Sequence, residues 1–459
     1  MKRLQPLIPA ISIFCLALVV RIIYNDVVAS NYVLVGDARN YNAIALYILS
    51  SHCFCLHPPA PTVDRTPLWP AIIASIYAIL GINNYFVRIF LCILDAGTCV
   101  FIYLFARDLF GRRIGVITGL AAAVYPQLYM YVDWLYSETL YIFLLFAFCY
   151  ALLRLQRTSW QRWMVVSGVL LGLLALARPN GLLVFGPFIL WMVILGWKKI
   201  LSWRAVARSA LIITLIMLIF VVPWTIRNYA VSHAFIPVAT GEGTILIGSY
   251  NNEVVSNPLV YGKWVNPNTA SPSLGQRYHY ADWQGPRVQL EREADFKHAA
   301  EAWIRGHISE LPFLFKYHFL RMWSAVPDEV YFPGDRGSQF FLSMAEAFPI
   351  FIYTLAAFGL LVSWKRWREL LFVYFMCLLV IAQCILFYGS ARLSSPIQPM
   401  VLILAAGGVW WLTRKEPGTL PWLFGQRAGA KVPTNGSPAG EAVTGLEDRE
   451  RALPDARTQ

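Results

Sequence analysis

The chain alternates between long apolar runs and short polar connections. The apolar runs are about 15 to 22 residues long, and a helix that crosses a bilayer needs roughly 20 predominantly apolar residues. This pattern predicts an all-α polytopic membrane protein, a bundle of about 10 transmembrane helices joined by loops. The expected spans are 7–24, 85–106, 114–131, 139–153, 163–177, 181–196, 209–227, 343–364, 370–387 and 397–412.

Lysine and arginine gather in every second connection between these spans. Cytoplasmic loops of membrane proteins carry an excess of both residues, so the pattern places these connections and both termini in the cytoplasm. The first span is expected to remain uncleaved, because Arg21 interrupts it and no small-residue cleavage site follows it. The basic residues are Lys2, Arg3, Arg107, Arg112, Arg113, Arg154, Arg157, Arg162, Lys198, Lys199, Arg204, Arg208, Lys365, Arg366, Arg368, Arg414 and Lys415.

Two apolar segments need special treatment to preserve this alternation of charge. The run 67–81, "PLWPAIIASIYAILG", is short for a span, and we expect it to form a re-entrant or interfacial helix. The long run that begins near residue 163 is split at Arg178-Pro179-Asn180-Gly181, because proline and glycine interrupt helices.

Two long segments then lie outside the membrane, 25–84 as the first external loop and 228–342 as the large one. Within the second, "EREADFKHAAEAWIRGH" places apolar residues at helical spacing, which predicts an amphipathic helix on the membrane surface or under a small external domain. Residues 1–412 are expected to form one transmembrane module. Residues 413–459, rich in Gly, Pro, Ala and charge, are expected to form a disordered cytoplasmic tail.

Composition supports a multi-pass protein of the inner (plasma) membrane. The 459 residues are 58% hydrophobic and 14% charged, whereas soluble proteins carry roughly 25% charged residues. The net charge of +12 arises from the short basic loops, so it indicates membrane orientation and no nucleic-acid partner. Cys53 and Cys55 lie in a loop beside His52 and His57, either as a metal or redox site or as two loop thiols.

Seven polar residues lie close to the external face of the membrane in this topology. Charges inside the hydrocarbon cost roughly 2.5–3.5 kcal/mol, so a protein carries few of them and they mark functional sites. The residues are Asp37, Arg65, Asp133, Glu138, Arg178, Arg227 and Arg392. Arginine presents a fork of donors that matches phosphate oxygens, and a carboxylate can take a proton from an attacking hydroxyl. Together they suit a sugar linked to a polyprenyl phosphate, whose lipid tail lies in the bilayer.

Six stretches occur in an order that resembles a known family. They are "GDARNYNAIAL", "DRTPLWPAIIASIYAILG", "LYSETL", "ARPNG", "PWTIRNY" and "ARLSSPIQP". The set is similar to bacterial GT-C glycosyltransferases of the protein-mannosyltransferase and lipid A aminoarabinose-transferase superfamily, and it covers most of residues 10–412. The resemblance implies an inverting transfer from a lipid-phosphate-linked sugar at the extracytoplasmic face.

The resemblance also implies roles for single residues. Asp37 matches the acid taken as the catalytic base, and Arg65 matches the basic residue near the lipid phosphate. Glu138 matches the acidic position where relatives orient the substrate or hold a metal, and Arg392 matches a carrier-binding arginine. This chain has Gly36 before Asp37 where many relatives have a second acid, so a metal site of two carboxylates is in question.

Each role has a structural alternative. Asp37 could cap the N-terminus of a helix, and Glu138 could be a favourable charge at a helix N-terminus. Arg65 and Arg392 could anchor the protein by extending to lipid headgroups.

Structural roles are also open for the remaining polar residues. Arg178 and Arg227 could position other groups, and Asp133 belongs to the same loop as Glu138. Asp95, inside a span, is expected to form interhelical hydrogen bonds. Several external aromatics could stack on a sugar or anchor at the interface. These are Tyr250, Trp264, Tyr278, Tyr280 and Trp283.

Two other classes of function compete with the glycosyltransferase. A polysaccharide polymerase or ligase that uses a polyprenyl pyrophosphate would also gather external arginines. A transporter would need polar or broken helices at mid-depth, where this chain has only Asp95 clearly charged. The sequence specifies no cofactor, and a divalent cation stays open. The acceptor is a lipid, a glycan or a protein hydroxyl.

Overall fold

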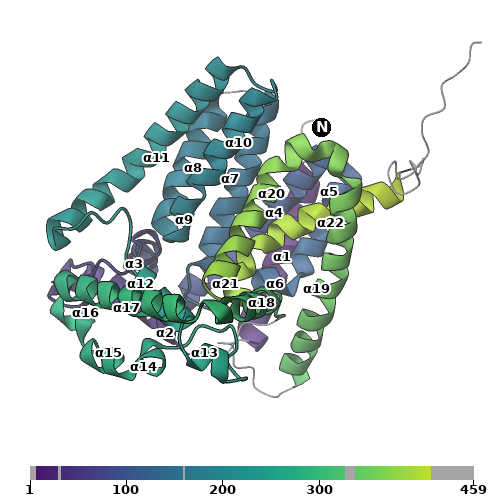
Figure 1. Ribbon diagram of the computed structural model, residues 1–459. Helices are drawn as coiled ribbons and strands as arrows, with labels where there is room; N and C mark the ends of the chain where they lie inside the picture. The colour runs from purple at the N-terminus through teal and green to yellow at the C-terminus, as the bar shows by residue number, and fades with distance from the viewer. Residues whose placement is uncertain (1–6, 29–32, 159–160, 326–335, 415–459) are drawn as a thin grey trace, which may run out of the picture. The chain divides into compact units, whose positions relative to one another are not determined.

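The computed structural model describes residues 7–28, 33–158, 161–325 and 336–414 (Figure 1). The described part of the chain is helical apart from loops and one antiparallel pair of short strands, β1 (Cys55–His57) and β2 (Ala60–Pro61). Beyond residue 414, the tail expected over 413–459 lies outside the described residues.

Among the described residues, eight helices are long and apolar enough to cross a membrane, and the chain is therefore a multi-pass membrane protein. The helices that provide them are α1 (Leu7–Ile23) with the π-helical turn η1 (Tyr24–Val28), α4 (Asn84–Phe110), α7 (Glu138–Thr158), α9 (Asn180–Leu183) with α10 (Phe185–Trp197), α11 (Trp203–Ser232), α19 (Arg336–Val362), η3 (Trp364–Arg366) with α20 (Trp367–Leu386), and α21 (Ala391–Ser394) with η4 (Ser395–Ile397) and α22 (Gln398–Thr413).

Two of the ten expected spans form helices shorter than these eight. The span expected over 114–131 is helical over α5 (Arg112–Val124) and α6 (Pro126–Tyr129), because Pro126 interrupts it. The 13 residues of α5 extend about 20 Å, short of a bilayer core of roughly 30 Å. The second is α8 (Gln161–Ala177), with 17 residues, which lies beside α7 and α11 (Figure 1).

The sequence places other helix boundaries correctly. α8 ends at Ala177 and α9 begins at Asn180, which confirms the expected break around Pro179. The run 67–81 forms α3 (Leu68–Leu80), whose 13 residues are too few to cross a membrane. Its interfacial or re-entrant placement stays a prediction.

The basic connections meet at one end of the membrane helices. Arg154 at the end of α7 contacts Asp108 at the end of α4, with Nη1 2.9 Å from the carboxylate oxygen. Arg157 contacts Glu369 at the start of α20 at 2.5 Å. α7 runs from Glu138 to this basic end over 21 residues, or about 31 Å at 1.5 Å per residue. Glu138 therefore lies at the opposite end of the bundle.

A buried ion pair joins the helices between these two ends. The Nε atom of Arg21 in α1 lies 2.6 Å from Oδ2 of Asp95 in α4, and both side chains are 1% exposed or less. Arg21 also donates to the backbone oxygens of Ala122 (3.3 Å) and Ala123 at the end of α5. The pair fixes α1, α4 and the shorter α5 against one another, which confirms the interhelical role expected of Asp95.

Removing one partner of this pair should destabilise the fold. Asp95→Asn leaves the Arg21 guanidinium buried without its counter-charge, and such a change costs about 3–5 kcal/mol. We expect a lower midpoint of thermal unfolding in detergent, with Ile93→Ala on the partly exposed side of α4 as the control. An unchanged midpoint for Asp95→Asn would contradict the structural role.

The segment between α5 and α7 is irregular and buried. Every residue from Tyr125 to Ser137 is buried, and irregular backbone at membrane depth is tolerated only when protein covers it. Side chains anchor it on several sides: Tyr131 Oη donates to the Ala391 oxygen at 3.0 Å, and Trp69 Nε1 donates to the Leu135 oxygen at 2.8 Å. This anchoring holds the residues before Glu138 in one conformation.

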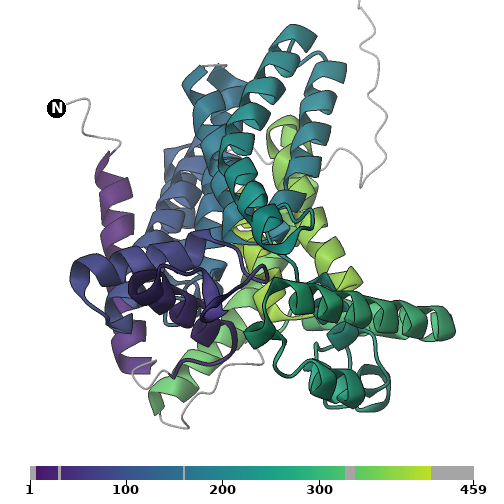
Figure 2. The same cartoon turned by 90° about the vertical axis from the view of Figure 1, so that its left-hand side faces the viewer.

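The large external segment forms a small domain with its own apolar core. Its core includes Ile247, Val254, Phe296, Ala300 and Leu314, a separate cluster from the core of the membrane helices. The elements are α12 (Glu242–Ser249), α13 (Glu253–Ser256), α14 (Pro267–Ala270), α15 (Pro272–Arg277), α16 (Ala281–Gln284), α17 (Pro286–Gly306), η2 (Ile308–Glu310) and α18 (Leu311–Arg321). Both views place this domain at the same end of the membrane helices as α2 (Gly36–Ser51) and α3 (Figures 1 and 2).

α17 is the expected amphipathic helix. Phe296 and Ala300 are buried in the core of the external domain, and Trp303 and Ile304 pack against it. Of the two expected placements, the structure therefore supports the one under a small external domain. In the neighbouring first external loop, Cys53 and Cys55 form a disulfide with each other.

Candidate active site

Five of the seven predicted site residues form one connected ionic cluster. Asp37 accepts from Arg65 Nη2 at 3.3 Å through Oδ1 and from Arg392 Nη2 at 2.6 Å through Oδ2. Glu138 Oε1 accepts from Arg178 Nη1 at 2.6 Å and also from Arg392 Nε. Arg392 therefore contacts both carboxylates, although it follows Asp37 by 355 positions in the chain.

The start of α2 places Asp37 in this cluster. Gly36 has φ +54°, a left-handed conformation that favours glycine, and a Cβ there would lie 3.1 Å from Tyr136 Oη. The N-cap position belongs to Val35, and no side chain caps the helix. The alternative role of Asp37 as the N-cap is therefore wrong, and its carboxylate is directed to the arginines. Glycine adopts this conformation without strain, which favours glycine directly before Asp37.

Glu138 and Tyr136 form the buried wall of the cluster. The Glu138 side chain is 0% exposed, and the Arg392 guanidinium lies 4.1 Å from the centre of the Tyr136 ring, a cation–π geometry. Tyr136 Oη in turn donates to the Val35 oxygen at 3.4 Å. Glu138 Oε2 has no hydrogen-bond partner among the described residues, and a buried polar atom without a partner is costly. The arginines of the cluster therefore pair with only one of the two Glu138 oxygens.

The three arginines lie at or next to helix ends. Arg178 follows α8, where Pro179 prevents the helix from continuing. Arg392 is in α21, whose first turn is capped by Ser390 Oγ accepting from the Arg392 backbone N–H at 3.1 Å. Arg65 precedes α3 in a segment held by Thr66 Oγ1, which donates to the Ala177 oxygen at 2.8 Å.

The cluster carries one excess positive charge, from three arginines and two carboxylates. Burial would raise the pKa of Asp37, but the charges of Arg392 and Arg65, and the hydrogen bond from Arg392, outweigh it and hold that pKa well below its usual range. The side chains of Asp37 and Arg65 are 32% and 25% exposed, so an anion can reach them. A partly buried site with excess guanidinium groups favours a phosphate oxyanion.

Two predicted site residues lie outside the cluster. Asp133 is buried, and burial raises its pKa to about 8 against the opposing effects of a backbone hydrogen bond and the Arg88 charge. Arg227 donates to the Thr62 oxygen at 2.7 Å and to the Phe54 oxygen at 3.1 Å. Its guanidinium also lies 4.8 Å from the Trp224 ring centre. It therefore fixes the first external loop and contacts no carboxylate of the cluster within the described structure.

The donor set around Asp37 and Glu138 does not fit a divalent cation. Magnesium and related ions prefer several oxygen ligands, whereas here both carboxylates are occupied by guanidinium groups. Over the described ranges, no group of three or more His, Cys, Asp or Glu side chains could hold a metal. We derive no chemical step through a metal.

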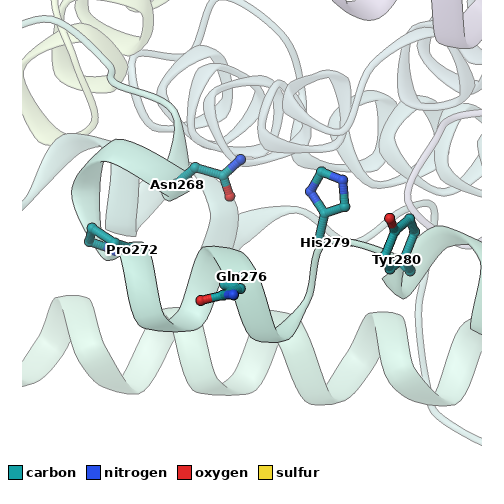
Figure 3. Close-up of a pocket in the computed structure, with 5 residues that line it drawn as sticks. All are labelled: Asn268, Pro272, Gln276, His279 and Tyr280. Carbon is teal, nitrogen blue, oxygen red and sulfur yellow. The ribbon is translucent and has the colours of Figure 1, made fainter.

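The external aromatics divide into buried and exposed ones. Tyr250 and Tyr278 are buried in the core of the external domain, whereas Tyr280 and Trp283 are 62% and 60% exposed. Figure 3 shows Tyr280 at one side of a shallow depression that none of the cluster residues lines. The depression is lined by Asn268, Pro272, Gln276, His279 and Tyr280. Sugar stacking on Tyr280 or Trp283 stays a prediction.

Part of the chain matches a known family of membrane glycosyltransferases. Residues 64–226 match the family model described as dolichyl-phosphate-mannose-protein mannosyltransferase. This range contains Arg65, Glu138 and Arg178, whereas Asp37 and Arg392 lie outside it. None of the curated proteins compared with the chain matches it.

Several solved structures are similar to this chain. The archaeal oligosaccharyltransferase AglB from Archaeoglobus fulgidus, in complex with an inhibitory peptide and a dolichol-phosphate, has 15% identity and a TM-score of 0.54, covering 87% of this chain and 50% of its own. Its apo form has 12% identity, the same coverage and a TM-score of 0.53. ArnT from Cupriavidus metallidurans, bound to undecaprenyl phosphate, has 15% identity and a TM-score of 0.41, covering 87% of this chain and 76% of its own.

These matches show the fold of the protein. The chain is a polytopic membrane protein with the GT-C fold, as the resemblance of its sequence motifs indicated. It spans about half the length of the archaeal oligosaccharyltransferases that it matches.

Sequence reasoning missed Tyr136 and the partners of Asp64. Tyr136 precedes Glu138 by two positions in an irregular loop, and the spacing of its neighbours gives no helical or strand pattern that would direct it to Arg392. Asp64 is beside the predicted Arg65, but its partner Arg292 is one of several charged residues in the first half of α17, and the sequence does not show which of them is buried.

Proposed function

We propose that the protein is an integral membrane glycosyltransferase that moves a sugar from a polyprenyl-phosphate-linked donor to an acceptor hydroxyl. The observation that supports this most strongly is the cluster in which Arg392 contacts both Asp37 and Glu138. Three arginines and two carboxylates at one end of a membrane bundle provide both the phosphate binding and the acid–base chemistry that this transfer requires.

The carrier phosphate binds to Arg65 and Arg392, with Arg178 completing the positive site. A guanidinium group donates two parallel hydrogen bonds to phosphate oxygens, so it holds the phosphate in a defined orientation. The polyprenyl chain extends into the bilayer beside the helices. When the sugar departs, the carrier phosphate keeps the bonding electron pair, and the arginines stabilise the charge that develops on it.

Asp37 is the general base. The acceptor oxygen attacks the anomeric carbon from the side opposite the phosphate, the bond from that carbon to the phosphate oxygen breaks, and Asp37 takes the hydroxyl proton. A single displacement of this kind inverts the anomeric configuration. In the free protein Asp37 is a weak base because two arginines pair with it. A bound phosphate shares these guanidinium groups, so donor binding strengthens the base.

Glu138 orients the cluster and the substrate. Its Oε1 holds Arg178 and Arg392 together, and through these arginines it orients the bound phosphate. Glu138 therefore contributes to catalysis by orientation. Arg227 and Asp133 act outside the cluster, in the placement of the loops that contain Arg65 and Glu138.

The site faces the extracytoplasmic side of the inner (plasma) membrane in this proposal. Two observations support the assignment: the basic connections lie at the other end of the bundle, and the Cys53–Cys55 disulfide lies in the first external loop. Disulfides persist in oxidising compartments outside the cytosol. The acceptor is then a lipid, a glycan or a protein at that surface.

The pH dependence of transfer should reveal the change in Asp37. An ordinary aspartate has a pKa of about 4. The pKa of Asp37 in the free protein is lower, so we expect kcat/KM to fall only at a pH below that value. Donor binding raises that pKa, so we expect the acid limb of kcat at a higher pH than that of kcat/KM. Steady-state rates measured from pH 3 to pH 8 would check this, and limbs in the reverse order would contradict the exchange of partners.

A comparison of donor classes tests the function. The purified protein is incubated with radiolabelled polyprenyl-phosphate sugars, polyprenyl-pyrophosphate glycans and nucleotide sugars, each with a membrane extract that supplies acceptors. We expect label to leave the monophosphate carrier only, and the product to have the inverted anomeric configuration. Release from the pyrophosphate carrier alone would support the polymerase or ligase instead, and movement of an intact donor across vesicles would support a transporter.

A further inference from the structure

Two adjacent residues connect the external domain to the cluster. Arg65 contacts Asp37 on one side, as described above. Asp64 is directed to the external domain, where its Oδ2 accepts from Nη2 of Arg292 in α17 and its Oδ1 accepts from Thr240 Oγ1. Asp64 is 4% exposed and Arg292 is 14% exposed, so water screens this contact little.

Arg292 is surrounded by carboxylates. Besides Asp64, its Nη1 lies 3.0 Å from Asp282 Oδ1 and its Nη2 lies 3.3 Å from Glu293 Oε1. Burial would lower the pKa of Arg292, but these three carboxylates raise it above its usual range. Its donors are used within the protein, and the three carboxylates outnumber its single positive charge, which disfavours a phosphate at this place. Arg292 is therefore a link in the structure and no part of the phosphate site.

The other contacts of residues 62–66 hold the path of the backbone. Gln289 Oε1 accepts from the Val63 N–H at 3.1 Å, and the Thr240 N–H donates to the Val63 oxygen at 3.0 Å. Arg227 donates to the Thr62 oxygen, as described above. The Asp64 N–H donates to Thr62 Oγ1 at 3.2 Å, and Thr66, on the other side of Arg65, is held by the Ala177 oxygen. The pair of Asp64 and Arg292 is the ion pair directly before Arg65, and it connects the backbone at Arg65 to α17.

We infer that Arg292 is a positioning residue, which sets the place of Arg65 relative to Asp37 through Asp64. The external domain thereby completes the carrier-phosphate site, although none of its own side chains belongs to that site. This inference rests on the proposed function. It also predicts that a displacement of α17 changes the affinity for the donor.

A double-mutant cycle tests this inference, because Arg292 and Arg65 share no direct contact. We expect Arg292→Gln to lower kcat/KM for the donor by about 10- to 100-fold, the range that a small misplacement of a binding group costs. In an Arg65→Gln background the same substitution should change kcat/KM by less than about twofold. Arg292→Lys should restore part of the loss, since it keeps the charge beside Asp64.

Two further variants guard against a purely structural effect. Asp64→Asn keeps the size of the side chain and should reproduce the loss of Arg292→Gln, and it replaces that variant in the cycle if Arg292→Gln does not fold. Arg287→Gln, on the same helix and 91% exposed, should have no effect. Losses that multiply in the double variant would overturn the inference while leaving the proposed function intact. A wild-type protein without transfer from any donor would instead overturn the proposed function, and the cycle would then be measured on binding of polyprenyl phosphate.

Discussion

Replacing Asp37 with asparagine should nearly abolish transfer while donor binding is retained. The substitution keeps the size of the side chain and removes the group that accepts the proton, and general-base catalysis contributes about 10²–10⁴-fold to a rate. The carboxylate also competes with phosphate for Arg65 and Arg392. Donor affinity should therefore stay the same or increase. The measurement is kcat for transfer together with the Kd of a non-transferable polyprenyl-phosphate sugar.

Asp295→Asn is a matched control for this prediction. Asp295 lies in the external domain, where it pairs with Arg277 at 3.0 Å and its side chain is 36% exposed. Its replacement should leave both constants unchanged. If Asp37→Asn retained near-normal turnover, Asp37 would not be the base, and the carboxylate would serve only to hold the arginines.

Replacing Arg392 with alanine should weaken donor binding more than any other arginine substitution in the cluster. Hydrogen bonds to charged groups are worth about 1.5–3 kcal/mol, which corresponds to about 10- to 150-fold in Kd. Arg392 also contacts both carboxylates, so Asp37 and Glu138 would repel the phosphate in its absence. Binding of polyprenyl phosphate to the purified variant measures the loss.

Two controls accompany the Arg392 variant. Arg392→Lys keeps the charge and loses the fork of donors, so its affinity should be intermediate. Arg39→Ala removes an exposed arginine two residues from Asp37 and should bind the donor normally. Wild-type affinity in Arg392→Ala, with an unchanged unfolding midpoint, would mean that Arg392 is a structural anchor.

The sequence predicts the membrane bundle well because apolar length and basic loops are local properties. The break at Pro179 and the apolar face of α17 follow from residues that are neighbours in the chain. The helix expected over 114–131 is interrupted at Tyr125, and the apolar content of the run does not show that other helices cover the segment after Pro126. Burial by distant segments is not visible in a local pattern.

For the candidate site too, the sequence predicts which end of the bundle the residues lie at, but not their contacts. The sidedness of the charges is sufficient to gather Asp37, Arg65, Glu138, Arg178 and Arg392 at one end of the bundle, and the structure brings these five together. It is not sufficient to say which charges pair. The same sidedness included Arg227 and Asp133, which the fold directs elsewhere.

Gly36 is the clearest example of what a pattern leaves open. Its absent side chain suggested a missing acid, whereas the structure shows a left-handed turn packed against Tyr136. The close approach depends on a residue 100 positions later, and only the folded chain shows it. A glycine at this position therefore serves the geometry of the cluster.

The central claim is that the cluster holds the phosphate of a lipid carrier, and a structure of the protein with bound polyprenyl phosphate tests it most directly. We predict that the phosphate lies within hydrogen-bond distance of Arg392 and Arg65, with the contacts of these arginines to Asp37 lengthened or lost. A phosphate bound at the opposite end of the bundle, near Arg154 and Arg157, with the cluster unchanged, would contradict the proposed site and the function derived from it.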